Sequence, residues 1–230
     1  MTSTTRSPIG AASGAAAVVL MLAGNSVFAG AGEDPTGEQA ITAFSAAEAG
    51  ARTLGIALEL AGFVAFAFFV AFLYRHLRTA GGPESWRATV ALIGGMLFLA
   101  VKVASGAPLV ALTASGADLG PELALALVAL NDGAFVMGWL ALGVFLLGAG
   151  AAAFPKRSLP TAVSVAGMVI GGAAVAAAAT LGAGPGILTF LLSLVWIVVT
   201  SVILVRRELR APAGASTGVA LGDAAWSVEV

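Results

Sequence analysis

The chain has 230 residues, of which 59% are hydrophobic and 10% are charged, and its net charge at pH 7 is −1. Soluble domains carry about 25% charged residues, so this composition excludes an ordinary water-exposed surface and predicts an integral membrane protein. The absence of cysteine excludes disulfides and thiolate metal sites, and a single histidine cannot supply a histidine-rich zinc site or two axial haem ligands. We therefore expect no metal and no cofactor.

Six segments are apolar over a length that can cross a hydrocarbon core about 30 Å thick, which takes about 20 residues of helix. The sequence predicts an all-α fold, a polytopic transmembrane helix bundle that forms a single domain over residues 1–210. We expect residues 211–230 to form a disordered cytoplasmic tail, because they are rich in small residues and have no periodic apolar face. The predicted spans lie near residues 9–29, 53–74, 88–112, 123–154, 161–181 and 186–205.

The first span, residues 9–29, has two interpretations. Arg6, the apolar stretch and the small residues around Ala29 are also typical of a signal peptide with a cleavage site. The apolar stretch is longer than a usual signal core, which favours an uncleaved anchor. Cleavage would leave five spans.

The basic residues of the connections alternate from one side of the predicted bundle to the other, and cytoplasmic loops are the ones enriched in lysine and arginine. This pattern predicts cytoplasmic termini and a multi-pass protein of a bacterial plasma membrane. His76 lies between Arg75 and Arg78, and we expect it to be solvated. The predicted cytoplasmic side carries Arg6, Arg75, Arg78, Arg87, Lys156, Arg157, Arg206, Arg207 and Arg210. The other side carries Glu33, Asp34, Glu38, Glu48, Asp118 and Glu122, with Arg52 as its one basic residue.

Small residues recur at helical spacing in two spans. Gly10 and Gly14 share one face of the first span, and Gly167 and Gly171 form a GxxxG pattern in the fifth. Such faces allow close approach of helix backbones in lipid, either within one bundle or between subunits. The expected partners are the lipid bilayer and a second copy or other membrane subunits. Nucleic acid is excluded, because no basic surface with interleaved aromatic residues is present.

Three ionisable residues, Glu59, Lys102 and Asp132, fall inside predicted spans. Each costs at least about 2.5 to 3.5 kcal/mol near the bilayer centre, so such residues usually face protein and have a partner. At 1.5 Å of rise per residue, Glu59 stands about 22 Å above Tyr74 and Lys102 about 21 Å above Ala88. The matched heights predict that the carboxylate and the ammonium meet.

Asp132 is harder to place, because the fourth predicted span is longer than the membrane is thick. In one alternative, Asn131 and Asp132 cap a helix that breaks at Gly133, and the carboxylate is wet. In the other, the helix is continuous and Asp132 and Asn131 join Glu59 and Lys102 in a polar cluster. Trp139 follows Asp132 by seven residues on the same helix face. It would line a cavity beside that cluster or pack in the core.

The cluster of Glu59, Lys102 and Asp132 is compatible with two functions. A lysine between carboxylates can fix the packing of three helices, which predicts a structural or accessory membrane bundle. The alternative is a binding site for a small solute or cation, or a proton relay, in a transporter or binding protein. The residues supply no nucleophile with a matched base, so we expect no enzyme and no catalytic residue.

The fourth span reads "LNDGAFVMGWLALGVFLLGAG" and is followed by "FPKRSLP". This arrangement resembles small multi-pass bacterial membrane proteins of a domain-of-unknown-function family. The resemblance covers mainly the fourth span and the loop behind it. It implies a six-helix bundle and adds no catalytic residue.

Overall fold

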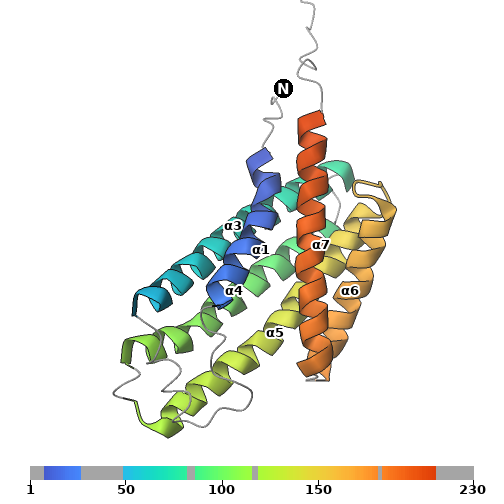
Figure 1. Ribbon diagram of the computed structural model, residues 1–230. Coiled ribbons are helices and arrows are strands. Elements are labelled where there is room, and N and C mark those ends of the chain that lie inside the picture. Colours follow the sequence, from blue (N-terminus) through green and yellow to red (C-terminus); the bar gives the residue numbers. More distant parts are fainter. Residues whose placement is uncertain (1–7, 27–48, 82–85, 116–118, 181–182, 211–230) are drawn as a thin grey trace, which may run out of the picture.

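The computed structural model describes residues 8–26, 49–81, 86–115, 119–180 and 183–210. These residues form six helices, each long and apolar enough to cross a membrane, and contain no strand (Figure 1). The predicted all-α bundle of six spans is therefore confirmed, and the chain is a multi-pass membrane protein. The residues around the cleavage site near Ala29 and the predicted tail at 211–230 lie outside the described part. The helices are α1 (Pro8–Ser26), α3 (Ala49–Gly81), α4 (Trp86–Ser115), α5 (Pro121–Ala153), α6 (Thr161–Ala179) and α7 (Ala183–Arg210).

Prolines mark the starts of several helices. Pro121 is the first residue of α5, and Pro160 occupies the N-cap of α6. Proline suits these places because the first N–H groups of a helix have no partner within it. The turn between α5 and α6 is tight, with the backbone N–H of Ser158 donating to the carbonyl of Ala153 at 3.2 Å. Arg157 in this turn has a φ of 49°, a left-handed conformation that lets the chain reverse direction.

The helices form a closed ring in which each packs against its neighbours in the sequence and α7 packs against α1. Helix α5 also contacts α3 and α7 across the ring, and it is the most deeply buried of the six. Figure 1 shows that α1 begins and α7 ends at the same end of the bundle, as an even number of antiparallel spans requires. Large apolar side chains cover the outside of the ring, for example Phe68 at 63% exposed. Such a surface suits lipid rather than water.

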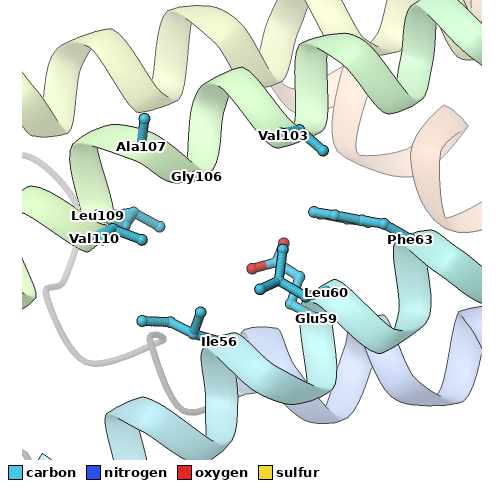
Figure 2. Close-up of a pocket in the computed structure, with 9 residues that line it drawn as sticks. All are labelled: Ile56, Glu59, Leu60, Phe63, Val103, Gly106, Ala107, Leu109 and Val110. Atoms are coloured by element: carbon cyan, nitrogen blue, oxygen red, sulfur yellow. The ribbon is translucent and has the colours of Figure 1, made fainter.

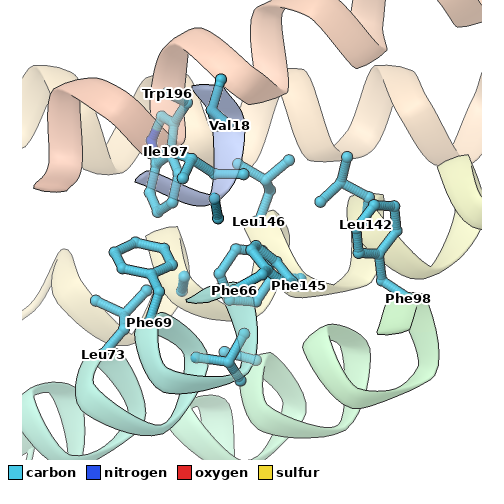
Figure 3. Close-up of a cluster of buried hydrophobic side chains, with 14 of the residues drawn as sticks. Val18, Phe66, Phe69, Leu73, Phe98, Leu142, Phe145, Leu146, Trp196 and Ile197 are labelled. Carbon is cyan, nitrogen blue, oxygen red and sulfur yellow. The ribbon is translucent and has the colours of Figure 1, made fainter. Parts of the chain in front are cut away.

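An aromatic cluster fills the middle of the ring (Figure 3). The Phe66 ring lies edge-on to the rings of Phe98 and Phe145, with centroids 5.3 and 5.6 Å apart. Trp196 of α7 meets Phe145 at 6.2 Å and a right angle. Edge-to-face pairs of this kind stabilise beyond the burial of their area. The cluster therefore joins α3, α4, α5 and α7 around one centre.

The predicted glycine faces lie at contacts between helices of the same bundle. A Cβ atom on Gly10 would come within 2.8 Å of the Phe72 ring on α3, and one on Gly14 within 2.6 Å of Phe69. In α6, a Cβ on Gly167 would lie 2.9 Å from the indole nitrogen of Trp196. These glycines thus allow α1 to approach α3 and α6 to approach α7.

A reciprocal contact between two glycine backbones joins α5 to α6. A Cβ on Gly171 would lie 2.7 Å from the carbonyl oxygen of Gly143, and a Cβ on Gly143 would lie 2.8 Å from the carbonyl oxygen of Gly171. No side chain fits between two backbones at that distance. The reciprocal contact explains why small residues occupy both positions.

Helix α5 is continuous through Asn131, Asp132 and Gly133, so the predicted alternative of a break and cap at these residues is wrong. The irregularity lies instead in α4, where Pro108 falls inside the helix. Proline has no N–H for the carbonyl of Ala104, one turn earlier, and its ring crowds that carbonyl. This weakened turn of α4 borders the site described next.

Candidate functional site

An ion pair joins α3 to α4. The ammonium nitrogen Nζ of Lys102 lies 3.4 Å from Oε1 of Glu59, and the two side chains are 12% and 14% exposed. Neither is fully buried, but both are largely shielded. The structure thus brings together the two residues whose heights match in the sequence.

Two aromatic rings complete the surroundings of Lys102. Nζ lies 5.2 Å from the ring centroid of Phe135 on α5 and 6.0 Å from that of Phe63 on α3. Both distances fall within the range at which the face of a ring attracts a cation. Phe63 follows Glu59 by four residues, which places both side chains on one face of α3. The ammonium therefore has a carboxylate and two ring faces around it.

Asp132 lies outside this pair. Its side chain is exposed and accepts a hydrogen bond of 3.3 Å from the amide of Asn131. Within the described residues, no ion pair joins it to Lys102. The physical reason is the register of α5 against α4: Phe135, three residues further along α5, takes the place beside the ammonium. The predicted cluster of three charges is therefore reduced to a pair.

Trp139 packs in the core rather than lining a cavity. It is 2% exposed, and its ring meets the Phe135 ring at 5.5 Å and 73°. Gly186 at the start of α7 lies against the indole, where a Cβ would overlap the ring. The indole nitrogen has no hydrogen-bond partner among the residues that the structure describes.

A cavity of about 310 Å³ lies between α3 and α4, with Glu59 in its wall (Figure 2). Gly106 leaves room on the α4 side, because a Cβ there would meet no atom within 4 Å. Pro108 lies in the same stretch of α4. Apart from Glu59, the lining side chains are apolar. The lining comprises Ile56, Glu59, Leu60, Phe63, Val103, Gly106, Ala107, Leu109 and Val110.

A second polar contact lies at the end of the bundle where α7 ends. The backbone carbonyl of Ser158 accepts a hydrogen bond of 3.3 Å from Nε2 of His76 and another from the guanidinium of Arg207. The end of α3, the turn before α6 and the end of α7 are thereby held together. His76 is therefore not simply solvated as expected. No sequence signal could indicate this contact, because the shared acceptor is a backbone carbonyl 82 residues away from His76.

The comparison with protein families gives one match. Residues 11–207 match the model of a family described as a domain of unknown function (DUF4386). The chain belongs to this family. The DUF4386 match reaches from α1 to α7, so it includes the ion pair, the cavity and the contact at Ser158. The predicted resemblance to a domain-of-unknown-function family is confirmed. No curated protein and no solved structure matches the chain.

Proposed function

We propose that this DUF4386 protein is a structural or accessory component of the membrane, in which the Glu59–Lys102 ion pair fixes the packing of α3 against α4. The observation that carries the proposal is the 3.4 Å contact between the two charged groups. Either charge alone would have to sit in lipid without compensation, which is costly. The pair gives each charge a partner, and its geometry specifies which faces of α3 and α4 meet.

A non-enzymatic role forms part of the proposal. The single histidine, His76, lies 17 residues along α3 from Glu59, which is about 26 Å of helix, and it is engaged with Ser158. A base at that distance cannot act on a group held at Glu59. The other charged group of the pair, the Lys102 ammonium, is already engaged by the Glu59 carboxylate.

We further propose a plasma membrane location with both termini cytoplasmic. In support, Arg78, Arg207 and Arg210 lie in the last turns of α3 and α7, and the contact at Ser158 gathers the ends of those helices on one side. Concentration of basic residues on one side is typical of the cytoplasmic face. The exposed apolar outside of the ring supports lipid as the principal partner.

The structural role can be tested by thermal unfolding of the purified protein in detergent micelles. Lys102→Met and Glu59→Gln should each lower the unfolding temperature, because each leaves one charge without its partner. Lys102→Met combined with Glu59→Leu should regain most of the loss. Lys156→Met, which removes an exposed charge in the turn before α6, is the matched control. Single variants as stable as the control would contradict the proposal.

A second candidate function, solute or cation binding or proton-coupled transport, is favoured by the cavity beside Glu59. A carboxylate that borders a cavity can bind a solute or carry a proton. This function predicts that Glu59→Gln abolishes flux while the protein stays folded. Proton uptake by proteoliposomes that contain a pH-sensitive dye measures it, with Asp132→Asn as the control. Equal proton uptake by the wild type, Glu59→Gln and Asp132→Asn would exclude a coupling of transport to Glu59.

A further inference from the structure

We infer that the cavity between α3 and α4 binds a small neutral amphiphile whose hydroxyl or amide head group donates a hydrogen bond to Glu59. This inference goes beyond the structural role of the ion pair, because it assigns a ligand class to a space that the pair borders. It rests on the shape of the cavity, on the chemistry of its wall and on the charge balance at Glu59.

The walls of the cavity suit an apolar body. Eight of the nine lining residues offer only carbon or glycine surface, and Glu59 is the exception. Leu60 and Val103 at the rim are 50% and 55% exposed, so the cavity opens sideways onto the outer surface of the bundle. A ligand can therefore enter from the hydrocarbon phase. A volume of about 310 Å³ is at the small end of ligand sites, which run from about 300 to 1,000 Å³.

The polar part of the ligand has one available partner. Oε1 of Glu59 is paired with Lys102, and an ionised carboxylate has about four lone-pair sites over its two oxygens. Figure 2 shows the Glu59 carboxylate directed into the space between α3 and α4. The remaining lone pairs can accept from a ligand but cannot donate. The ligand must therefore bring the hydrogen.

The charge balance at Glu59 favours a neutral hydrogen-bond donor over a cation as the head group of the ligand. The Glu59–Lys102 pair is neutral overall, so a bound ammonium would add an uncompensated charge in a low-dielectric setting. An anionic head group would meet the Glu59 carboxylate without a donor. A hydroxyl or amide supplies the hydrogen bond and leaves the charge balance unchanged. Free alcohols and membrane lipids with a hydroxyl head group share this chemistry.

The test is photolabelling of the full chain in phosphatidylcholine vesicles with a decanol that carries a diazirine near the end of its alkyl chain. The labelled peptides, mapped by mass spectrometry, should fall within residues 56–63 and 103–110. A diazirine decane without the hydroxyl should label these peptides about tenfold or more weakly, because it lacks a hydrogen bond to a charged group. The matching decylammonium and decanoate probes should also label them more weakly than decanol.

Gly106→Leu supplies the blocking variant. Its side chain would enter open space, and leucine suits a helix better than glycine, so the fold should persist. Labelling by decanol should fall about tenfold or more. Gly172→Leu on α6, where a Cβ also meets no atom within 4 Å, is the matched control and should label like the wild type.

The source of the ligand is distinguished by a second probe, a diacylglycerol with the diazirine in one acyl chain. Labelling of the cavity peptides by this lipid identifies a membrane source, and labelling by decanol alone identifies a small free alcohol. Equal labelling by decanol and decane, or labelling that Gly106→Leu does not reduce, would overturn the inference. Both outcomes are independent of the unfolding temperatures that test the structural role of the pair.

Discussion

The two halves of α4 pack against their neighbours in opposite ways. In the first half, Gly94 lies so close to α5 that a Cβ would come within 2.8 Å of the backbone of Phe145. In the second half, Gly106 faces open space, and α4 is joined to α3 by the Lys102–Glu59 ion pair beside a cavity. Lipid provides no water-driven force between helices, so contact depends on close van der Waals packing or on polar bonds. Helix α4 packs its backbone closely against α5 in the first half, and in the second half an ion pair joins it to α3.

The largest effect should come from reversing a charge in the open half. Lys102→Glu would place a second carboxylate beside Glu59, and we expect a loss of about 3 to 5 kcal/mol of unfolding free energy. The measurement is equilibrium unfolding in mixed micelles. Adding Glu59→Lys to the same chain should restore much of the loss, since opposite charges then face each other again. A swapped chain as unstable as Lys102→Glu alone would show that the pair does not join the two helices.

In the packed half, Gly94→Ala should lower the unfolding free energy by about 1 to 3 kcal/mol. The new methyl group can be accommodated only by moving α4 away from α5. The same unfolding assay measures it. An unchanged stability would mean that the contact at Gly94 is looser than the structure shows.

Gly106→Ala provides the matched change in the open half, with the opposite sign. The methyl group meets no neighbour there, and alanine in place of glycine favours the helix by up to about 1 kcal/mol. We expect a small rise in the unfolding free energy. A loss as large as that of Gly94→Ala would remove the contrast between the two halves.

The smallest effect should come from Asp132→Asn. Asp132 is exposed and outside the ion pair, so the change should stay within about 0.5 kcal/mol in the same assay. A loss comparable to that of Lys102→Met would indicate that Asp132 is a third member of the charged site after all.

The spans could be predicted because a run of about 20 apolar residues is a strong signal that neighbouring structure does not alter. The pairing of Glu59 with Lys102 could also be predicted, because rise per residue fixes the height of each group in a span. The position of Asp132 could not be fixed in this way, because α5 is 33 residues long and its ends do not mark the membrane boundary.

The sequence could not show which neighbouring helix each side chain faces. Phe135 lies beside Lys102, yet in an apolar span it has no pattern that distinguishes it from a core residue. The cavity depends on how α3 and α4 diverge, which follows from tertiary packing. Gly106 and Pro108 are visible in the sequence, but a glycine there is equally compatible with a close contact such as that of Gly94.

The pairing of Lys102 with Glu59 is tested most directly by solid-state NMR of the Lys102 ammonium in a lipid bilayer. The chain has two lysines, Lys102 and Lys156, so protein with 15N at the lysine Nζ gives two signals that Lys156→Arg assigns. The glutamate and aspartate carboxyls carry 13C. An ion pair with an N to O distance below about 4 Å should give dipolar transfer from Lys102 Nζ to a glutamate carboxyl. This transfer should disappear in Glu59→Gln. Transfer to an aspartate that disappears in Asp132→Asn, or no transfer to any carboxyl, would contradict the pairing of Lys102 with Glu59.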